Sequence, residues 1–118
     1  MNSTVIQPDY PSQHADGCIK WITKQLHALE PGQQDVVLLP EYANTPGIEE
    51  SNEMRRCAES TGTKFLQHVA SSAKRLGCLI ATGAVVREGE QWFNRTLVFD
   101  ASGEVVFHYD KIHLTTTE

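Results

Sequence analysis

The sequence predicts an α/β fold in which a mixed β-sheet carries helices on one face. Residues 36–39 are four consecutive branched apolar residues, which is typical of a strand buried on both faces of a sheet. Two longer segments, 12–29 and 62–76, have their apolar residues at helical spacing. From residue 78 onward the pattern changes to three strand-like runs separated by turn residues. The order β-α-β-α-β-β-β fits a layered α/β structure.

The first elements are a short strand and an amphipathic helix. Residues 4–7 form the expected strand, which Pro8 ends. Ser12 is the expected N-cap of a helix that runs to about Leu29, where Pro31-Gly32 stops it. The apolar positions that share one face of this helix are Ala15, Cys18, Ile19, Ile22, Leu26 and Leu29.

The central part of the chain contains the buried strand and two further helices. Pro40 cannot donate to a sheet ladder, so the strand ends there and the chain leaves the sheet. A turn at 45–47 and a short polar helix around 48–58 follow. The second amphipathic helix opens at Gly62-Thr63, and Gly77 occupies the position of a C′ glycine.

The last third of the sequence reads as three strands, at residues 78–87, 92–100 and 104–110. The segment Asp100-Ala101-Ser102-Gly103 between the second and third suits a hairpin turn with glycine in the left-handed conformation. We therefore expect consecutive antiparallel strands at this edge of the sheet.

Glu41 is the first candidate functional residue. It follows the buried strand directly, and open α/β sheets bind their ligands at the carboxyl ends of strands. The alternative on this pattern alone is an ordinary solvated carboxylate in a loop.

A second motif, FHYDKIHL at residues 107–114, changes that balance. Together with LPEY it resembles the nitrilase, or carbon–nitrogen hydrolase, superfamily, whose active site is a Glu–Lys–Cys triad. The resemblance extends from residue 4 to the last residue and implies the first half of an αββα sandwich. It also implies that Glu41 is the catalytic glutamate, acting as general base and acid, and that Lys111 is the catalytic lysine, which stabilises developing negative charge. We therefore expect the side chains of Glu41 and Lys111 to converge within hydrogen-bonding reach at one end of the sheet.

The family's nucleophilic cysteine has no counterpart in this chain. In the family it follows the lysine on a later strand, whereas Cys18, Cys57 and Cys78 all precede Lys111. We expect Cys18 and Cys78 to be inert core thiols and Cys57 to be half-buried. The 118 residues are therefore expected to form a partial domain that lacks the nucleophile and is inactive by itself.

Several further residues have a weaker connection with the site. Tyr42 and Asn44 are expected to line the pocket rim, and Asn94 to satisfy backbone groups between strands. Glu118, seven residues after Lys111, is either a second active-site glutamate that binds substrate or a free side chain.

The histidines of the second motif have expected roles of their own. Strand alternation places His113 on the face of Lys111, where a structural hydrogen bond is its expected role. His108, Asp110 and His113 have the residue types of a metal site, but their opposed faces argue against one, so no metal or cofactor is expected.

Composition excludes several classes of protein. The net charge of −5 argues against a nucleic-acid surface, and the longest apolar run is too short to span a bilayer. Three cysteines without metal-like spacing and a start without a signal sequence fit a cytoplasmic protein. Two functions remain open. One is a hydrolase that acts on a small amide, nitrile or N-carbamoyl substrate and that could form a homo-oligomer. The other is a non-catalytic pairing or structural module with the same half-fold.

Overall fold

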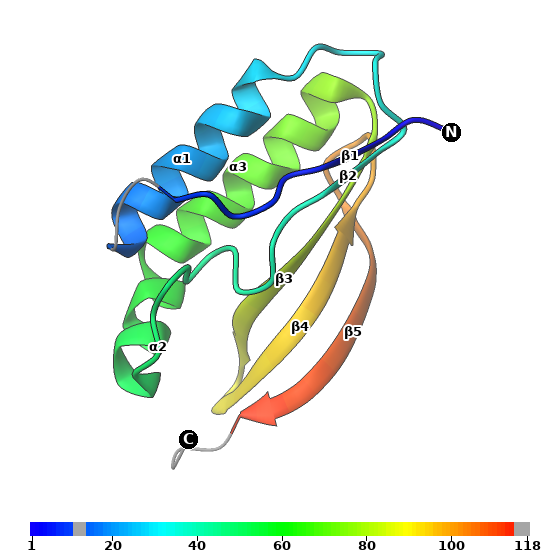
Figure 1. Ribbon diagram of the computed structural model, residues 1–118. Helices are drawn as coiled ribbons and strands as arrows, with labels where there is room; N and C mark the ends of the chain where they lie inside the picture. Colours follow the sequence, from blue (N-terminus) through cyan, green and yellow to red (C-terminus); the bar gives the residue numbers. More distant parts are fainter. Residues whose placement is uncertain (11–13, 115–118) are drawn as a thin grey trace.

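The computed structural model describes residues 1–10 and 14–114. They form one five-stranded sheet in the order β1-β2-β3-β4-β5, and the two long helices lie along one face of it (Figure 1). The elements in chain order are β1 (Ser3–Val5), α1 (Ala15–Ala28), β2 (Val36–Leu38), α2 (Ser51–Glu59), α3 (Thr61–Leu76), β3 (Leu79–Glu88), β4 (Gln91–Phe99) and β5 (Val105–Leu114).

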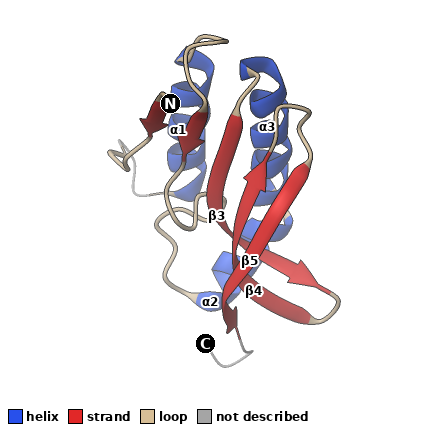
Figure 2. Ribbon diagram, turned by 90° about the vertical axis from the view of Figure 1, so that its right-hand side faces the viewer, coloured by secondary structure: helices blue, strands red, loops and turns tan. Residues whose placement is uncertain are grey.

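The sheet is mixed, as the sequence predicts. Strands β1, β2 and β3 are parallel, and helical segments connect them. Strands β3, β4 and β5 are antiparallel and joined by tight turns, so they form the long curved edge that Figure 2 shows. In the turn between β4 and β5, Gly103 adopts a positive φ of 84°, which confirms the predicted left-handed glycine.

The core lies between the two long helices and the sheet. Ile22 and Leu26 of α1 are fully buried, as are Val69 of α3 and Ile80 of β3. Apolar residues spaced along one side of each helix meet the sheet, and burying each such side chain stabilises the fold by about 1.5–3 kcal/mol. The helix stripes read from the sequence are therefore confirmed.

The opposite face of the sheet is less covered than the sequence predicts. Of the run expected to be buried on both faces, Val37 is fully buried but Leu38 is 40% exposed. The strand pairing sets Leu38 in one row across the sheet with Val5 at one end and Phe107 at the other, which are 56% and 57% exposed. The prediction was wrong for this face because no helix of the described residues packs over the row. We call this row the open face; its members are Val5, Leu38, Ala81, Val98 and Phe107.

The helix ends differ slightly from the predicted ones. Helix α1 has its N-cap at His14, and the expected cap Ser12 lies outside the described residues. Helix α2 is capped by the Glu50 side chain, which accepts hydrogen bonds from two backbone N–H groups of the first turn. Gly77 ends α3 with a φ of 68°, as predicted. Among the helices of the described part, none is long and apolar enough to cross a membrane.

Candidate active site

The loop that carries Glu41 is attached to the free edge of β3 at two points. Before the loop, the Leu39 N–H donates to the Ala81 carbonyl at 2.9 Å, and after it the Ala43 N–H donates to the Gly83 carbonyl at 3.0 Å. Glu41 lies at the middle of the short arch between these two attachments. The anchors therefore fix the backbone that presents the carboxylate, although β2 itself ends at Leu38.

Two backbone features allow this arch to lie close to the sheet. A Cβ atom built on Gly83 would lie 3.2 Å from the Glu41 Cα, which is tighter than most Cβ contacts, so glycine permits the approach. Tyr42, the next residue, has a φ of 54°, in the left-handed region that bulky residues rarely adopt. Backbone in such a conformation persists only where surrounding contacts hold it.

Asn44 supplies part of that restraint. Its Nδ2 donates to the Val85 carbonyl at 2.8 Å, and its Oδ1 accepts from the Val85 N–H at 2.9 Å. The amide thus takes the place of a strand residue beside β3. Asn44 is fully buried, so its position differs from the pocket rim expected from the sequence.

Lys111 is displaced from regular pairing by an irregularity in β5. Arg95 pairs with Asp110 and Asn94 pairs with Ile112, so Lys111 is an extra residue with no partner on β4. Such a β-bulge bends the strand and redirects side chains, and bulges are frequent beside active sites. The shift also interrupts the strict alternation used to place His113, whose side chain lies outside the described residues.

The two main predicted residues meet in the structure. The Lys111 Nζ donates a hydrogen bond to the Glu41 Oε1, and the two residues are 70 positions apart in the sequence. Their side chains are 42% and 63% exposed, so reagents and substrates can reach the pair in the described part of the molecule. The predicted convergence of Glu41 and Lys111 is confirmed.

Tyr42 is the second expected rim residue, and its half-buried side chain packs against the cluster of Ala58, Val85 and Trp92. Its hydroxyl oxygen accepts a hydrogen bond from the Asn94 Nδ2 at 3.0 Å. Asn94 was expected to bond backbone groups, but its Nδ2 instead binds the side chain of Tyr42, the residue that follows Glu41 in the sequence. Glu118, the remaining candidate, lies outside the described residues.

The neighbour of Asn94, Arg95, was missed in the sequence. Its guanidinium forms two hydrogen bonds with the Asp110 carboxylate, at 2.5 and 3.1 Å, and a third with Glu88 at 2.6 Å. These contacts hold the pKa of Asp110 and that of Glu88 below their usual values. The available signal was the polar run Asn94-Arg95-Thr96, which lies between apolar residues of β4.

The three cysteines are buried or half-buried. Cys18 and Cys78 are 1% and 3% exposed, and burial raises the pKa of each. Cys57 is half-buried, and its Sγ donates to the Asn44 carbonyl. The expected burial of all three is confirmed, and the thiolate forms of Cys18 and Cys78 are disfavoured at neutral pH.

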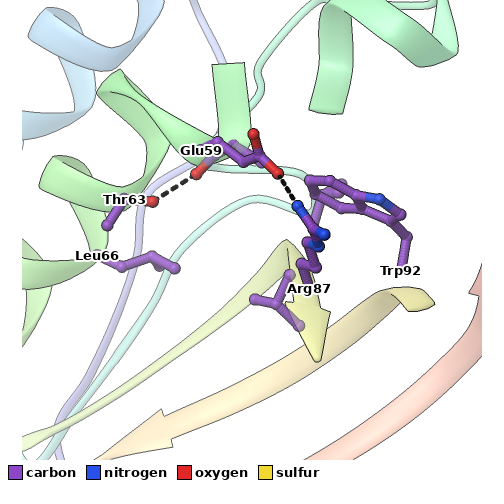
Figure 3. A pocket seen from close by; sticks show the side chains of 8 residues that line it. Glu59, Thr63, Leu66, Arg87 and Trp92 are labelled. Atoms are coloured by element: carbon purple, nitrogen blue, oxygen red, sulfur yellow. Dashed lines mark hydrogen bonds and ion pairs between the residues drawn. The ribbon is translucent and has the colours of Figure 1, made fainter. Parts of the chain in front are cut away.

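A pocket of about 210 Å³ lies elsewhere, between α2, α3 and the hairpin of β3 and β4 (Figure 3). Leu66 and Trp92 contribute apolar walls, and an Arg87–Glu59 ion pair at 2.8 Å lies beside them. Neither Glu41 nor Lys111 lines this pocket. Within the described residues, no three His, Cys, Asp or Glu side chains are grouped closely enough to hold a metal ion.

Comparison with known proteins identifies one family that this chain matches. The model of the family described as carbon–nitrogen hydrolase matches residues 4–118. No match was found among curated proteins.

Solved structures with the same fold are numerous. The protein XC1258 from Xanthomonas campestris, a CN-hydrolase superfamily protein, is 26% identical with a TM-score of 0.70, and the match covers 99% of this chain and 42% of that one. The NitFhit protein of C. elegans is 17% identical with a TM-score of 0.74, over 96% and 27% of the two chains. A double mutant of an amidase from Nesterenkonia sp. AN1, solved with acrylamide, is 17% identical with a TM-score of 0.72, over 98% and 44%. The chain thus spans less than half the length of these neighbours.

Proposed function

This chain belongs to the carbon–nitrogen hydrolase family, and we propose that it supplies the glutamate and lysine of a Glu–Lys–Cys site that hydrolyses non-peptide carbon–nitrogen bonds. The observation that carries the proposal is the hydrogen bond from Lys111 to Glu41. The two residues occupy the family's motif positions, and the bond joins them across 70 residues of sequence.

The proposed chemistry divides the work between three side chains. A cysteine thiol, supplied by sequence beyond this chain, gives its proton to the Glu41 carboxylate, and the resulting thiolate attacks the carbonyl or nitrile carbon. The Lys111 ammonium stabilises the negative charge that develops on the substrate oxygen or nitrogen. Glu41 then returns the proton to the departing amine and later takes one from the water that releases the acyl-enzyme.

The proposed substrates are small amides, nitriles or N-carbamoyl compounds. The amidase from Nesterenkonia sp. AN1, solved with acrylamide, supports a primary amide as the first compound to test. The exposure of Glu41 and Lys111 in the described residues leaves room for such a molecule beside the pair.

We further propose that residues 1–118 are the amino-terminal part of a larger catalytic domain. The match covers 42% of XC1258 and 44% of the amidase chain, and the open face of the sheet leaves Leu38 and Phe107 exposed. An apolar row of this kind is typical of a surface that further protein covers. The polypeptide of 118 residues alone should therefore lack hydrolase activity.

The test of the catalytic assignment uses the intact protein and its Glu41→Gln and Lys111→Met variants. Ammonia release from small amides and nitriles should fall by about 10²–10⁴-fold in kcat in each, the range for losing an acid–base group or a charge stabiliser. Glu59→Gln is the matched control, because Glu59 is also an exposed carboxylate in an ion pair. Full activity in both Glu41→Gln and Lys111→Met would refute the assignment.

A separate assay addresses the 118-residue polypeptide alone. No turnover is expected, since loss of the nucleophile removes most of the rate in a covalent mechanism. Turnover that survives purification and is abolished by a Ser substitution at Cys18, Cys57 or Cys78 would identify a different nucleophile.

The open face supports a second candidate, a non-catalytic pairing module. Its apolar row would then bind another protein and Glu41 would have no chemical role. A coding sequence that continues beyond residue 118 into a G-x-x-x-C segment favours the hydrolase. A stable 118-residue product, soluble and inactive, favours the module.

A further inference from the structure

Arg95 lies on β4, directly beside the irregularity that displaces Lys111. Its pairing partner on β5 is Asp110, the residue that precedes Lys111 in the chain. The described residues thus contain a second ion pair, Arg95–Asp110, beside the Lys111–Glu41 pair. One peptide bond joins Asp110 of the first pair to Lys111 of the second.

The Arg95–Asp110 contact is a charge-assisted, two-point hydrogen bond, which is stronger than a single neutral one. Two guanidinium nitrogens, Nε and one Nη, bind the two carboxylate oxygens of Asp110, and the other Nη binds Glu88. The Arg95 side chain is only 9% exposed, so this pairing is shielded from water on the arginine side. Two-point contacts of this type fix orientation as well as distance.

The bulge needs such a restraint. A strand whose register slips by one residue turns every following side chain to the other face of the sheet. Here the slip is adjacent to Lys111, which has no cross-strand partner of its own. A two-point contact at the residue before it determines where the extra residue falls.

We propose that Arg95 is a positioning residue that acts through Asp110, holding the β5 bulge at Lys111 so that the lysine is directed at Glu41. The proposal rests on the proposed function for its catalytic meaning, but the geometry that it describes can be tested without activity.

Zero-length cross-linking measures that geometry directly. A water-soluble carbodiimide condenses a carboxylate with an amine only when the two are in contact. Glu41 and Lys111 are in contact and both partly exposed, so the intact protein should yield a Glu41–Lys111 isopeptide, quantified by mass spectrometry after proteolysis. Arg95→Met should reduce the yield by roughly tenfold, the change that a ~1.4 kcal/mol loss of the contact geometry produces.

A double variant separates positioning from simple stability. Arg95→Met alone leaves the Asp110 carboxylate without its guanidinium, whereas Arg95→Met with Asp110→Leu removes both members of that pair and leaves only the Glu88 carboxylate, which is 61% exposed. Replacing a shielded ion pair by apolar residues often leaves stability unchanged or higher. The proposal expects the double variant to unfold at the wild-type urea concentration yet to keep the low cross-link yield.

Matched controls and a kinetic readout complete the experiment. Arg87→Met breaks the exposed Arg87–Glu59 pair on the same hairpin and should leave the cross-link unchanged. If the hydrolase proposal holds, the double variant should also lose kcat by about 10-fold or more with little change in KM, since misplacing a reacting group by ~1 Å can cost ~10²-fold. A double variant that cross-links like the wild type overturns the positioning role. A normal cross-link pattern in an inactive wild-type protein would instead count against the hydrolase proposal alone.

Discussion

Replacing Asn44 by alanine should destabilise the protein more than any exposed substitution nearby. The Asn44 amide forms two hydrogen bonds with the backbone of Val85, at 2.8 and 2.9 Å, and both residues are buried. Each bond contributes about 1 kcal/mol net, and leaving a buried N–H or carbonyl without a partner costs about 1–3 kcal/mol. Allowing for partial rescue by water, we expect a loss of about 2–4 kcal/mol in the free energy of unfolding.

Urea unfolding of the intact protein at 25 °C measures this loss. The midpoint should fall while the slope of the transition stays constant, because the surface exposed on unfolding is unchanged. The matched control is Asn52→Ala on the exposed side of α2, which should stay within about 0.5 kcal/mol of the wild type. If Asn44→Ala also stays within that margin, the Asn44 amide does not replace a strand at the β3 edge and the account of the Glu41 loop is wrong.

Two further changes probe other parts of the fold. Gly83→Ala sets a Cβ 3.2 Å from the Glu41 Cα, so the loop must move by a few tenths of an ångström. Under the proposed hydrolase function, kcat of the intact protein should fall by about tenfold with a small change in melting temperature. An unchanged kcat would show that the close approach is irrelevant to the proposed site. Burial, with smaller contributions from His27 and Arg75, lowers the pKa of His68 in the folded protein below its ordinary 6.5. As the pH falls, the unfolded chain therefore binds a proton at His68 before the folded protein does. The free energy of unfolding should decline as the pH falls below about 6.5. The urea midpoint of the wild type should therefore rise with pH between about pH 5 and 7.5, and His68→Gln should make that dependence weaker. The control His108→Gln, at an exposed histidine, should keep the wild-type dependence on pH.

The fold was predictable from the sequence wherever a pattern reports local geometry. The stripes of α1 and α3, the left-handed Gly77 and Gly103 and the order of the strands all follow from spacing and turn chemistry. Whether protein covers both faces of β2 was not predictable in the same way. A run of apolar residues shows that a strand is suited to two covered faces, but covering the second face depends on protein that packs there.

The contact between Glu41 and Lys111 was predictable from the sequence, but the features that support it were not. Glu41 and Lys111 occupy the positions of the two sequence motifs, and the order of the strands brings both positions to one part of the sheet. The bulge at Lys111 was not predictable, because alternation assumes regular pairing, and the extra residue is defined only by the partner strand. For the same reason, Arg95 reads as an isolated polar residue until its register with Asp110 is known.

The contact between Glu41 and Lys111 is a consequence of how many strands separate them. Glu41 lies off the free edge of β3, and Lys111 lies on β5, with β4 between them. Strands are spaced by about 4.8 Å, so the interval from β3 to β5 alone is about 10 Å, and a glutamate and a lysine meet across it more readily when their backbones also approach. Gly83 allows that approach by letting the Glu41 backbone lie close against β3, and the bulge contributes from the other side by displacing Lys111 from regular pairing. A side chain at Gly83 and a regular β5 should each lengthen the gap, and together they should separate the pair even if every residue of the motif remains.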